Sequence, residues 1–298
     1  MTDSIDEICI ANGFENPVRI GAGGQGVVYK VFFPFEQRDF AIKISGLGYT
    51  TEGARAFRRE ASLQRRVSRD HPRIPYVYDF NSPESNPSLR YIIMDYAGDG
   101  TLLNNVLPVD TVVDVALSLV EALDACHKKL VVHGDVKPSN VCLDGSRVSL
   151  IDFGAARQYK DLEAEYRGSD SERTFFQGTI GYAAPERVFS FVAPEAFESS
   201  DIFSTGITLY ELLSGKKPFH ELEEGRRNPE DTIFTYLRRI REKDYVPLQA
   251  SVPAISERLA TLVHSMIEHD PHHRPASFRT IADEFAKYRA SKSEYLPK

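Results

Sequence analysis

The stretch HGDVKPSN at residues 133–140, followed by the triplet DFG at residues 152–154, decides the fold of this 298-residue chain. The stretch brings an acid, a base and an amide together in one short segment, at Asp135, Lys137 and Asn140. The triplet adds a second acid. Residue types in this order and at this spacing are far more specific than the glycine or charge patterns elsewhere in the chain. They indicate a catalytic segment.

A glycine-rich segment, GAGGQG at residues 21–26, lies upstream between strand-like runs at 18–20 and 27–31. Backbone without side chains can approach phosphate oxygens closely, so the segment fits a loop that folds over phosphates. Taken alone, it also fits a glycine-rich hairpin turn. A dinucleotide-binding fold needs the last glycine to open a helix, whereas VVYKV at 27–31 continues as a strand. The context favours a phosphate-covering hairpin.

Lys43 lies in the next strand-like run, residues 40–44, where it alternates with apolar neighbours. Because successive side chains of a strand point to opposite faces, its ammonium group projects to a defined face. A lone lysine on a strand is more often a surface residue. Glu60, on a helical segment further along, offers a carboxylate that could hold it. We therefore expect Lys43 and Glu60 to pair.

The glycine loop, the strand lysine, the catalytic stretch, DFG and the triplet APE at residues 184–186 occur in one order along the chain. In this order they resemble the eukaryotic-type protein kinase superfamily, from Val18 to Phe285. The resemblance implies an α+β, bilobal protein kinase fold with a small β-rich N-lobe carrying one main helix and a larger α-helical C-lobe. The expected parts are an N-terminal extension at 1–17, the N-lobe at 18–96 and the C-lobe at 97–298.

Hydrophobic periodicity agrees with this division, since it changes from strand-like to helical after about the first third of the chain. Strands are expected at 18–20, 27–31, 40–44 and 91–94. Helices are expected at 55–69, 113–123, 201–213 with a stop at Ser214-Gly215, 256–267 and 277–288. The polar segment 159–174 is expected to be a mobile surface loop.

Phosphoryl transfer depends mostly on positioning and on stabilising spread negative charge. By resemblance, Asp135 orients the attacking hydroxyl, Lys137 neutralises the transferred phosphoryl group, and Lys43, fixed by Glu60, holds the α- and β-phosphates of ATP. The resemblance also implies that Asn140 and Asp152 hold Mg²⁺, with Mn²⁺ as an alternative. The residues implied in ATP binding are Ile20, Gly21, Ala22, Gly23, Gly26, Val28, Ala41, Lys43, Met94, Asp95, Ala97 and Leu143.

The segment GTIGYAAPE at residues 178–186 resembles the substrate-docking part of the family, although a second APE triplet follows at 193–195. The first triplet is preceded by the Gly-Thr pair, and it leaves more residues before Asp201 than the second triplet does. We therefore assign the first triplet to the motif. By resemblance, Arg274 forms a structural ion pair with Glu186, and Asp201 is structural as well. The implied activation-loop residues are Ser169, Ser171, Thr174 and Thr179. Lys137 and Thr179 imply protein substrates that carry serine or threonine, together with autophosphorylation.

The chain departs from the family pattern at two positions. Gly134 stands where most members have an arginine that pairs with a phosphorylated activation loop, so the chain resembles a non-RD kinase. Arg157 and Arg173 are candidate substitutes for that arginine. We expect activity that is not gated by loop phosphorylation. Gln64 stands where the family usually places an apolar residue, and weaker docking of its helix is expected.

Two alternatives stay open. Gly134 and Gln64 are the main support for a pseudokinase, a nucleotide-binding or scaffolding module. Against it, Lys43, Asp135 and Asp152 are all present. A small-molecule phosphotransferase of similar fold would lack the Gly178-Thr179 and APE arrangement.

The overall composition limits the classes of partner that we expect for this chain. The net charge of −7 gives no positive field for nucleic acid, so none is expected as a partner. The apolar stretch 109–130 is interrupted by four acidic residues, and no membrane segment is expected. An acidic N-terminus in place of a basic and apolar leader predicts no signal peptide.

Three cysteines without close pairing predict a reducing compartment, hence a cytoplasmic protein, with export into another cell left open. No zinc is expected, because the histidines lack metal-ligand spacing. They are interpreted as surface or helix-end residues: His127, His264, His269, His272 and His273.

Overall fold

The computed structural model describes residues 2–24, 26–46, 50–69, 71–82, 90–167, 178–188, 196–219 and 229–293. The chain forms two compact units. Unit 1 holds Met1–Gly100 and Cys142–Ala156, and unit 2 holds Thr101–Val141 and Arg157–Lys298. In the part of the chain so described, no helix is long and apolar enough to span a bilayer.

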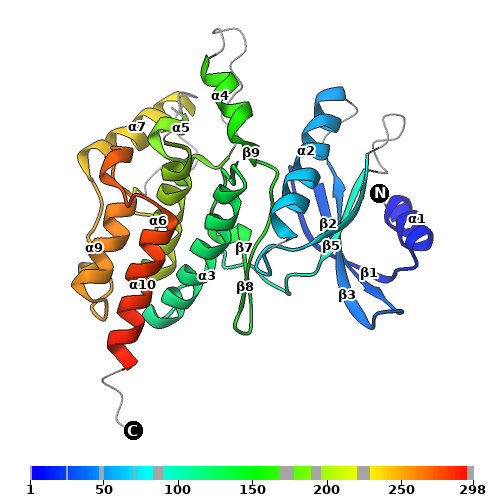
Figure 1. Cartoon of the computed structure of the whole chain (residues 1–298), viewed down its shortest axis with the longest axis horizontal. Helices are drawn as coiled ribbons and strands as arrows, with labels where there is room; N and C mark the ends of the chain where they lie inside the picture. The colour runs from blue at the N-terminus through cyan, green and yellow to red at the C-terminus, as the bar shows by residue number, and fades with distance from the viewer. Residues whose placement is uncertain are drawn as a thin grey trace. The chain divides into compact units, whose positions relative to one another are not determined.

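Unit 1 is built on a five-stranded antiparallel sheet with the strand order β1-β2-β3-β5-β4 (Figure 1). The strands are β1 (Glu15–Gly23), β2 (Gly26–Phe33), β3 (Arg38–Ser45), β4 (Val77–Asn81) and β5 (Tyr91–Asp95). Consecutive strands joined by short turns explain the β1-β2-β3 meander, and β5 then pairs with β3 from the other side. The β-rich N-terminal fold predicted from the sequence is confirmed.

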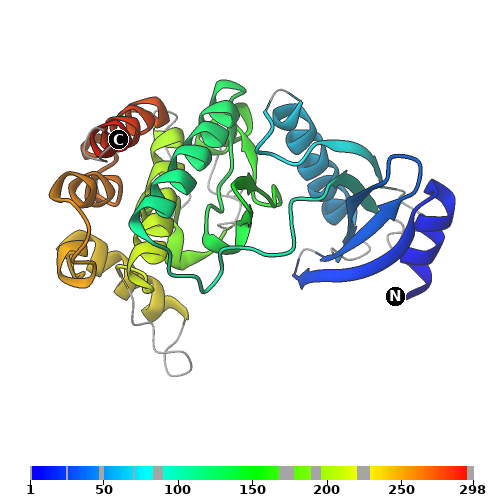
Figure 2. The same cartoon turned by 90° about the horizontal axis from the view of Figure 1, so that it is seen from below.

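The two faces of this sheet are covered by different helices, α1 (Thr2–Asn12) and α2 (Thr51–Ser68) (Figure 1 and Figure 2). Neighbouring residues of β5 show the division: Ile93 packs in the cluster of α1, whereas Ile92 packs in the cluster of α2. The α1 cluster contains Ile5, Ile8, Cys9, Val31, Phe40, Ile42 and Ile93. The alternation of a strand therefore directs Ala41 and Lys43 of β3 to the face that carries α2.

Helix α1 and the start of β1 occupy the segment expected as an extension, residues 1–17, and both belong to unit 1. The sequence interpretation missed this helix. Its signal is the set of buried residues Ile5, Ile8 and Cys9, which recur at helical spacing.

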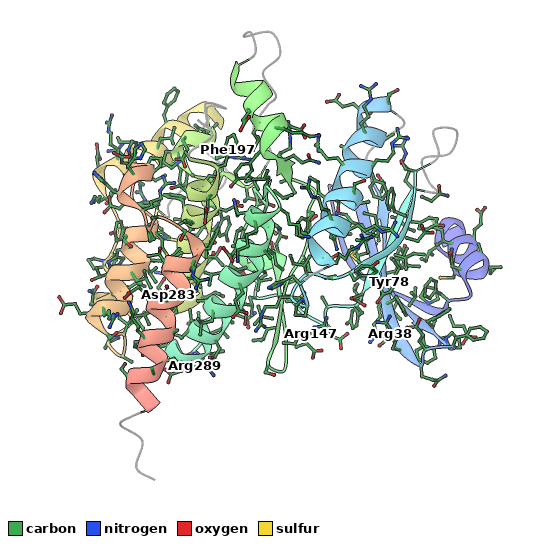
Figure 3. The ribbon with its side chains drawn as sticks, in the orientation of Figure 1. Arg38, Tyr78, Arg147, Phe197, Asp283 and Arg289 are labelled. Atoms are coloured by element: carbon green, nitrogen blue, oxygen red, sulfur yellow. The ribbon has the colours of Figure 1, made fainter. Side chains whose placement is uncertain are left out.

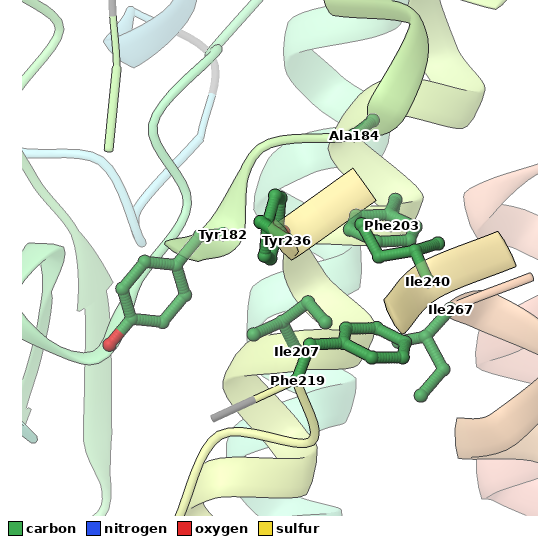
Figure 4. Packing of buried hydrophobic residues seen from close by; sticks show 8 residues of the cluster. All are labelled: Tyr182, Ala184, Phe203, Ile207, Phe219, Tyr236, Ile240 and Ile267. Carbon is green, nitrogen blue, oxygen red and sulfur yellow. The ribbon is translucent and has the colours of Figure 1, made fainter. Parts of the chain in front are cut away.

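Unit 2 is mainly helical. Its longer helices are α3 (Val109–Lys128), α4 (Tyr159–Arg167), α6 (Phe197–Ser214), α7 (Pro229–Glu242), α9 (Glu257–Met266) and α10 (Phe278–Ser293). Helix α6 is buried along most of its length and supplies Phe203 and Ile207 to the apolar cluster of Figure 4. The other members are Tyr182, Ala184, Phe219, Tyr236, Ile240 and Ile267. The short helices α5 (Pro185–Val188) and α8 (Leu248–Ser251) complete the set.

Local capping chemistry sets two of the helix ends as predicted. Gly215 ends α6 with a φ of 76°, the left-handed conformation that glycine adopts without a Cβ penalty. The side chain of Ser256 begins α9 by accepting a hydrogen bond from the backbone N–H of Leu259 at 3.3 Å.

The segment 159–174, expected to be a mobile loop, begins with helix α4, so that prediction is wrong for residues 159–167. Helix α4 follows strand β9 (Arg157–Gln158), which pairs with β6 (Val131–Val132). Tyr159 and Leu162, one helical turn apart, pack against a buried cluster that contains Val132 and Phe197. The polar composition concealed this apolar stripe. Residues 168–174 lie outside the described part of the chain.

Candidate active site

The glycine segment forms the turn between β1 and β2 in unit 1. Gly23 pairs with Gly26, and Gly21 pairs with Val28. Gly26 has a φ of 147°, and a Cβ atom at this position would lie 2.0 Å from the backbone oxygen of Ile44. Only glycine can adopt this backbone beside β3. Ile20 and Ala22 lie along the exposed strand β1.

Replacing Gly26 by alanine should lower the free energy of unfolding by about 2 kcal/mol, because the new methyl group meets backbone in a disfavoured conformation. The matched control is Gly24→Ala, since a Cβ atom there has no neighbour within 4 Å. It should change the stability by less than about 0.5 kcal/mol. Chemical denaturation measures both variants. Equal stability of the two would contradict the role given to Gly26.

Lys43 lies opposite Val28 in the β2–β3 ladder and is almost fully buried. Its Nζ atom is 2.5 Å from Oε1 of Glu60 on α2 and 2.9 Å from Oδ1 of Asp152. Burial alone would lower the pKa of Lys43, but the two carboxylates raise it above its ordinary value. Unit 1 therefore holds a permanent cation between two acids.

Asp152 adopts a φ of 64°, a left-handed conformation that is uncommon for residues other than glycine. Its Oδ1 atom also accepts a hydrogen bond from the backbone N–H of Gly154 at 3.3 Å. Phe153 beside it is fully buried. Anchoring on both sides holds the carboxylate in a conformation that an unconstrained chain would rarely adopt.

The end of β5 carries Met94 and Asp95, two of the residues implied in ATP binding. Met94 pairs with Ala41 of β3. The carboxylate of Asp95 accepts hydrogen bonds from Arg38 Nη1 and the Tyr78 hydroxyl, both at 2.9 Å. The two donor residues, Arg38 and Tyr78, are labelled in Figure 3. The side chain of Asp95 is therefore engaged within the sheet. Leu143, which lies in strand β7 (Val141–Asp144), and Ala97 are half-buried in the same unit.

Gln64 is only 1% exposed, although it is polar. Its Nε2 atom donates to the backbone oxygen of Pro75 at 3.0 Å and contacts the sulfur of Met94 at 3.4 Å. The amide therefore ties α2 to the segment before β4. Weaker docking of this helix was expected from the loss of an apolar side chain alone. That expectation did not include the polar contact that Gln64 makes.

In unit 2, the catalytic stretch forms a compact polar cluster around Asp135, which is 8% exposed. Oδ2 of Asp135 lies 2.7 Å from Lys137 Nζ and accepts a hydrogen bond from Asn140 Nδ2 at 3.2 Å. Lys137 Nζ also donates to the Thr179 hydroxyl at 2.7 Å. Oδ1 of Asp135 is buried and has no hydrogen-bond partner among the described residues. A buried acceptor without a partner is costly, so this oxygen is available for a ligand.

Asp201 of α6 supports the backbone immediately before Asp135. Its carboxylate accepts hydrogen bonds from the backbone N–H groups of His133 and Gly134, at 2.8 and 2.9 Å, and lies 2.8 Å from His127 Nε2. Burial alone would raise the pKa of Asp201, but these hydrogen bonds outweigh it and lower the pKa. Gly134 has a φ of 78°, a conformation that suits glycine.

The pair implied between Glu186 and Arg274 is present in unit 2. Two parallel contacts join them, Nη1 to Oε1 at 2.7 Å and Nη2 to Oε2 at 3.0 Å. The guanidinium also donates to the backbone oxygens of Glu268, Ser199 and His269. Because the arginine side chain is 0% exposed, this bidentate pair fixes the segment around Glu186.

His127, interpreted from the sequence as a surface or helix-end residue, lies in the last turn of α3 but is not on the surface. It is 6% exposed and bonds to both Asp201 and Tyr159. The signal is its place on the buried face of α3, at helical spacing from Val120 and Leu123. Of the predicted activation-loop residues, Thr179 is described, whereas Ser169, Ser171 and Thr174 lie outside the described residues.

Unit 1 thus holds a glycine hairpin and a lysine paired with carboxylates, and unit 2 holds an aspartate with a buried oxygen that has no partner among the described residues. The family model of the protein kinase domain matches residues 14–286, and the chain belongs to this family. Protein kinases in general use ATP with a divalent metal ion and act on protein substrates.

Three bacterial kinases are among the proteins similar to this chain. The chain is 28% identical to serine/threonine-protein kinase PrkC of Bacillus subtilis, over 86% of this chain and 37% of that protein. It is 30% identical to serine/threonine-protein kinase pkn2 of Myxococcus xanthus, over 93% of this chain and 32% of that protein. It is 28% identical to serine/threonine-protein kinase PknB of Mycobacterium tuberculosis, over 89% and 40%. The chain thus spans less than half the length of these relatives.

Proposed function

We propose that this chain is a serine/threonine protein kinase that transfers the γ-phosphoryl group of ATP to hydroxyl groups of protein substrates and of itself. The observation that carries the proposal is the unpartnered, buried Oδ1 of Asp135 beside Lys137. A serine or threonine hydroxyl can donate its proton to that oxygen. The nearby ammonium group is suited to stabilise charge on the transferred group.

The hydrogen bonds of the cluster support separate roles for its members. Oδ2 of Asp135 is held by Lys137 and Asn140, which leaves Oδ1 as the oxygen that meets the substrate. Thr179 binds the same ammonium group and so links substrate-docking segment and catalytic stretch. This contact supports the preference for serine and threonine that Lys137 and Thr179 imply.

In unit 1, the proposed nucleotide site rests on Lys43, which would contact the α- and β-phosphates. Glu60 holds its ammonium group in place and keeps it from extending elsewhere. Val28, Ala41 and Leu143 would form the apolar walls against adenine. The proposed lobes are residues 18–96 and 97–298.

Asn140 and Asp152 are the proposed ligands of magnesium, with Mn²⁺ as an alternative. Asn140 uses its amide nitrogen toward Asp135, and its Oδ1 accepts no hydrogen bond from the described residues. Oxygen donors of this kind, an amide and a carboxylate, are those that magnesium prefers. When bound, the metal ion would neutralise negative charge on the phosphates.

The cysteines are compatible with a reducing compartment, which we propose as the place of action. Cys9, Cys126 and Cys142 are free and buried. Burial, together with nearby acids, raises the pKa of Cys9 and Cys142 to about 11, so the thiols stay protonated.

Incubation of the protein with labelled ATP, magnesium and a generic protein substrate tests the proposed function. We expect label on serine and threonine after acid hydrolysis. Label on tyrosine alone would contradict the substrate class. Binding of nucleotide without any transfer would favour the pseudokinase alternative instead.

We also propose that the kinase is of the non-RD type and that its activity is independent of phosphate on the segment 168–177. Replacing Ser169, Ser171 and Thr174 by alanine together should leave kcat within about twofold of the unchanged protein, since Gly134 offers no guanidinium for a phosphate. Initial rates with a peptide substrate, after phosphatase treatment of both proteins, measure this. A loss of turnover in a folded triple variant would show that these residues control the activity, and the proposal would be wrong.

A further inference from the structure

Tyr159 makes an unusual set of contacts for the first residue of a polar surface helix. Its hydroxyl lies 2.6 Å from Nδ1 of His127, and its backbone N–H donates to the oxygen of Leu130 at 3.0 Å. Its ring packs edge-on against Phe197, with the ring centroids 4.9 Å apart. The start of α4 is therefore fixed by contacts of both backbone and side chain.

His127 connects Tyr159 to Asp201. Its Nε2 atom lies 2.8 Å from Oδ2 of Asp201, and the carboxylate of Asp201 accepts the backbone N–H groups of His133 and Gly134. One continuous series of hydrogen bonds thus leads from α4 to the backbone that precedes Asp135. All of its members belong to unit 2.

The protonation states agree along this series. Burial and the negative charges of Asp201 and Glu198 raise the pKa of Tyr159, so its hydroxyl stays protonated and can donate. Asp201 has a lowered pKa and stays an ionised acceptor. His127 lies between these two groups, with Nε2 at 2.8 Å from Asp201 and Nδ1 at 2.6 Å from the Tyr159 hydroxyl, so both ring nitrogens have a hydrogen-bond partner.

We propose that Tyr159 is a positioning residue for catalysis, which couples the segment after DFG to the catalytic stretch through His127 and Asp201. The family places an arginine before the catalytic aspartate for such a coupling, and here that position is Gly134. In this chain a tyrosine hydroxyl, with no phosphate needed, makes the connection. The inference rests on the proposed function. It adds an explanation of how the catalytic stretch of the proposed kinase is held in its active conformation.

The test is Tyr159→Phe, which removes the hydroxyl and keeps the ring that packs on Phe197. We expect kcat to fall about 5- to 10-fold, the loss of roughly one hydrogen bond in the transition state. KM for ATP should stay within twofold, because the nucleotide-binding residues lie in unit 1. Initial rates over a range of ATP concentrations separate the two constants.

The matched control is Tyr210→Phe. Tyr210 is a buried tyrosine of unit 2, and its hydroxyl donates to the backbone oxygen of Val246, away from the catalytic stretch. This variant should keep the kcat of the unchanged protein. An equal fall of kcat in both variants would show a general loss of rigidity and would overturn the proposal.

Hydrogen exchange followed by mass spectrometry gives a readout that a merely structural role would not move. In Tyr159→Phe, peptides that contain residues 133–134 should exchange faster, whereas peptides from α9 should not change. Unchanged exchange, a kcat within twofold, or failure of Tyr159→Phe to fold would each overturn the positioning role. If the protein without any substitution transferred no phosphoryl group, that result would instead overturn the proposed function.

Discussion

Replacing Asp135 by asparagine should lower kcat about 10³-fold, which is the usual contribution of a positioned proton acceptor. The amide oxygen can take the place of Oδ2, where Lys137 and Asn140 donate. The amide nitrogen then takes the place of Oδ1. Since that nitrogen donates hydrogen bonds, it cannot accept the proton of a substrate hydroxyl. Steady-state transfer to a peptide measures the effect.

Two observations must accompany that loss. Asp135→Asn should still show the rise in melting temperature that Mg-ADP gives the unchanged protein, because Lys43 is untouched. The control Asp283→Asn makes the same chemical change on the exposed face of α10 and should keep the full rate. If Asp135→Asn kept more than a tenth of the wild-type rate, the role assigned to its carboxylate would be wrong.

Replacing Lys43 by methionine should be damaging in two ways. It removes the cation proposed to contact the phosphates, so transfer should fall at least about 10²-fold. It also leaves the buried carboxylate of Glu60 facing Asp152 without a counter-charge, which should destabilise the protein by about 3–5 kcal/mol. Denaturant unfolding and ATP titration measure the two effects separately.

The pH dependence of that instability gives an internal check. Burial raises the pKa of Glu60 above its ordinary value, and removing Lys43 leaves nothing to oppose this effect. A carboxyl group with a raised folded-state pKa favours folding when protonated, and this stability is lost as the pH rises through that pKa. The destabilisation of Lys43→Met should therefore shrink toward acidic pH.

The double variant Lys43→Met with Glu60→Leu separates stability from function. It removes the unpaired charge and should recover much of the lost stability, yet it should stay inactive. A double variant no more stable than Lys43→Met would show that the buried pair is not the source of the instability.

The sequence predicts the parts of this molecule that depend on local pattern. Alternation along residues 40–44 places Lys43 on one face of a strand, and the structure pairs it there with Glu60. The Gly215 cap and the Ser256 start follow from backbone chemistry within one turn. Helix α1 could also have been predicted in this way, from the spacing of Ile5, Ile8 and Cys9.

Other parts depend on contacts between residues far apart in the sequence. Segment 159–167 is polar, and its helix packs on Phe197, a partner that no local pattern indicates. His127 lacks metal-ligand neighbours in sequence, yet it serves Asp201, which is 74 positions away. Motif matching identified Asp201, whereas it missed His127 and Tyr159, which continue the same series of hydrogen bonds.

The two-sided covering of the unit 1 sheet has a practical consequence for preparing the protein. A shortened chain that begins at Val18 would keep every motif but would lose α1 and the first residues of β1. The side chains of Val31, Phe40, Ile42 and Ile93 would then face water as one apolar patch. Patches of this kind promote aggregation, so samples for crystallisation or assay should retain the residues from Thr2 onward.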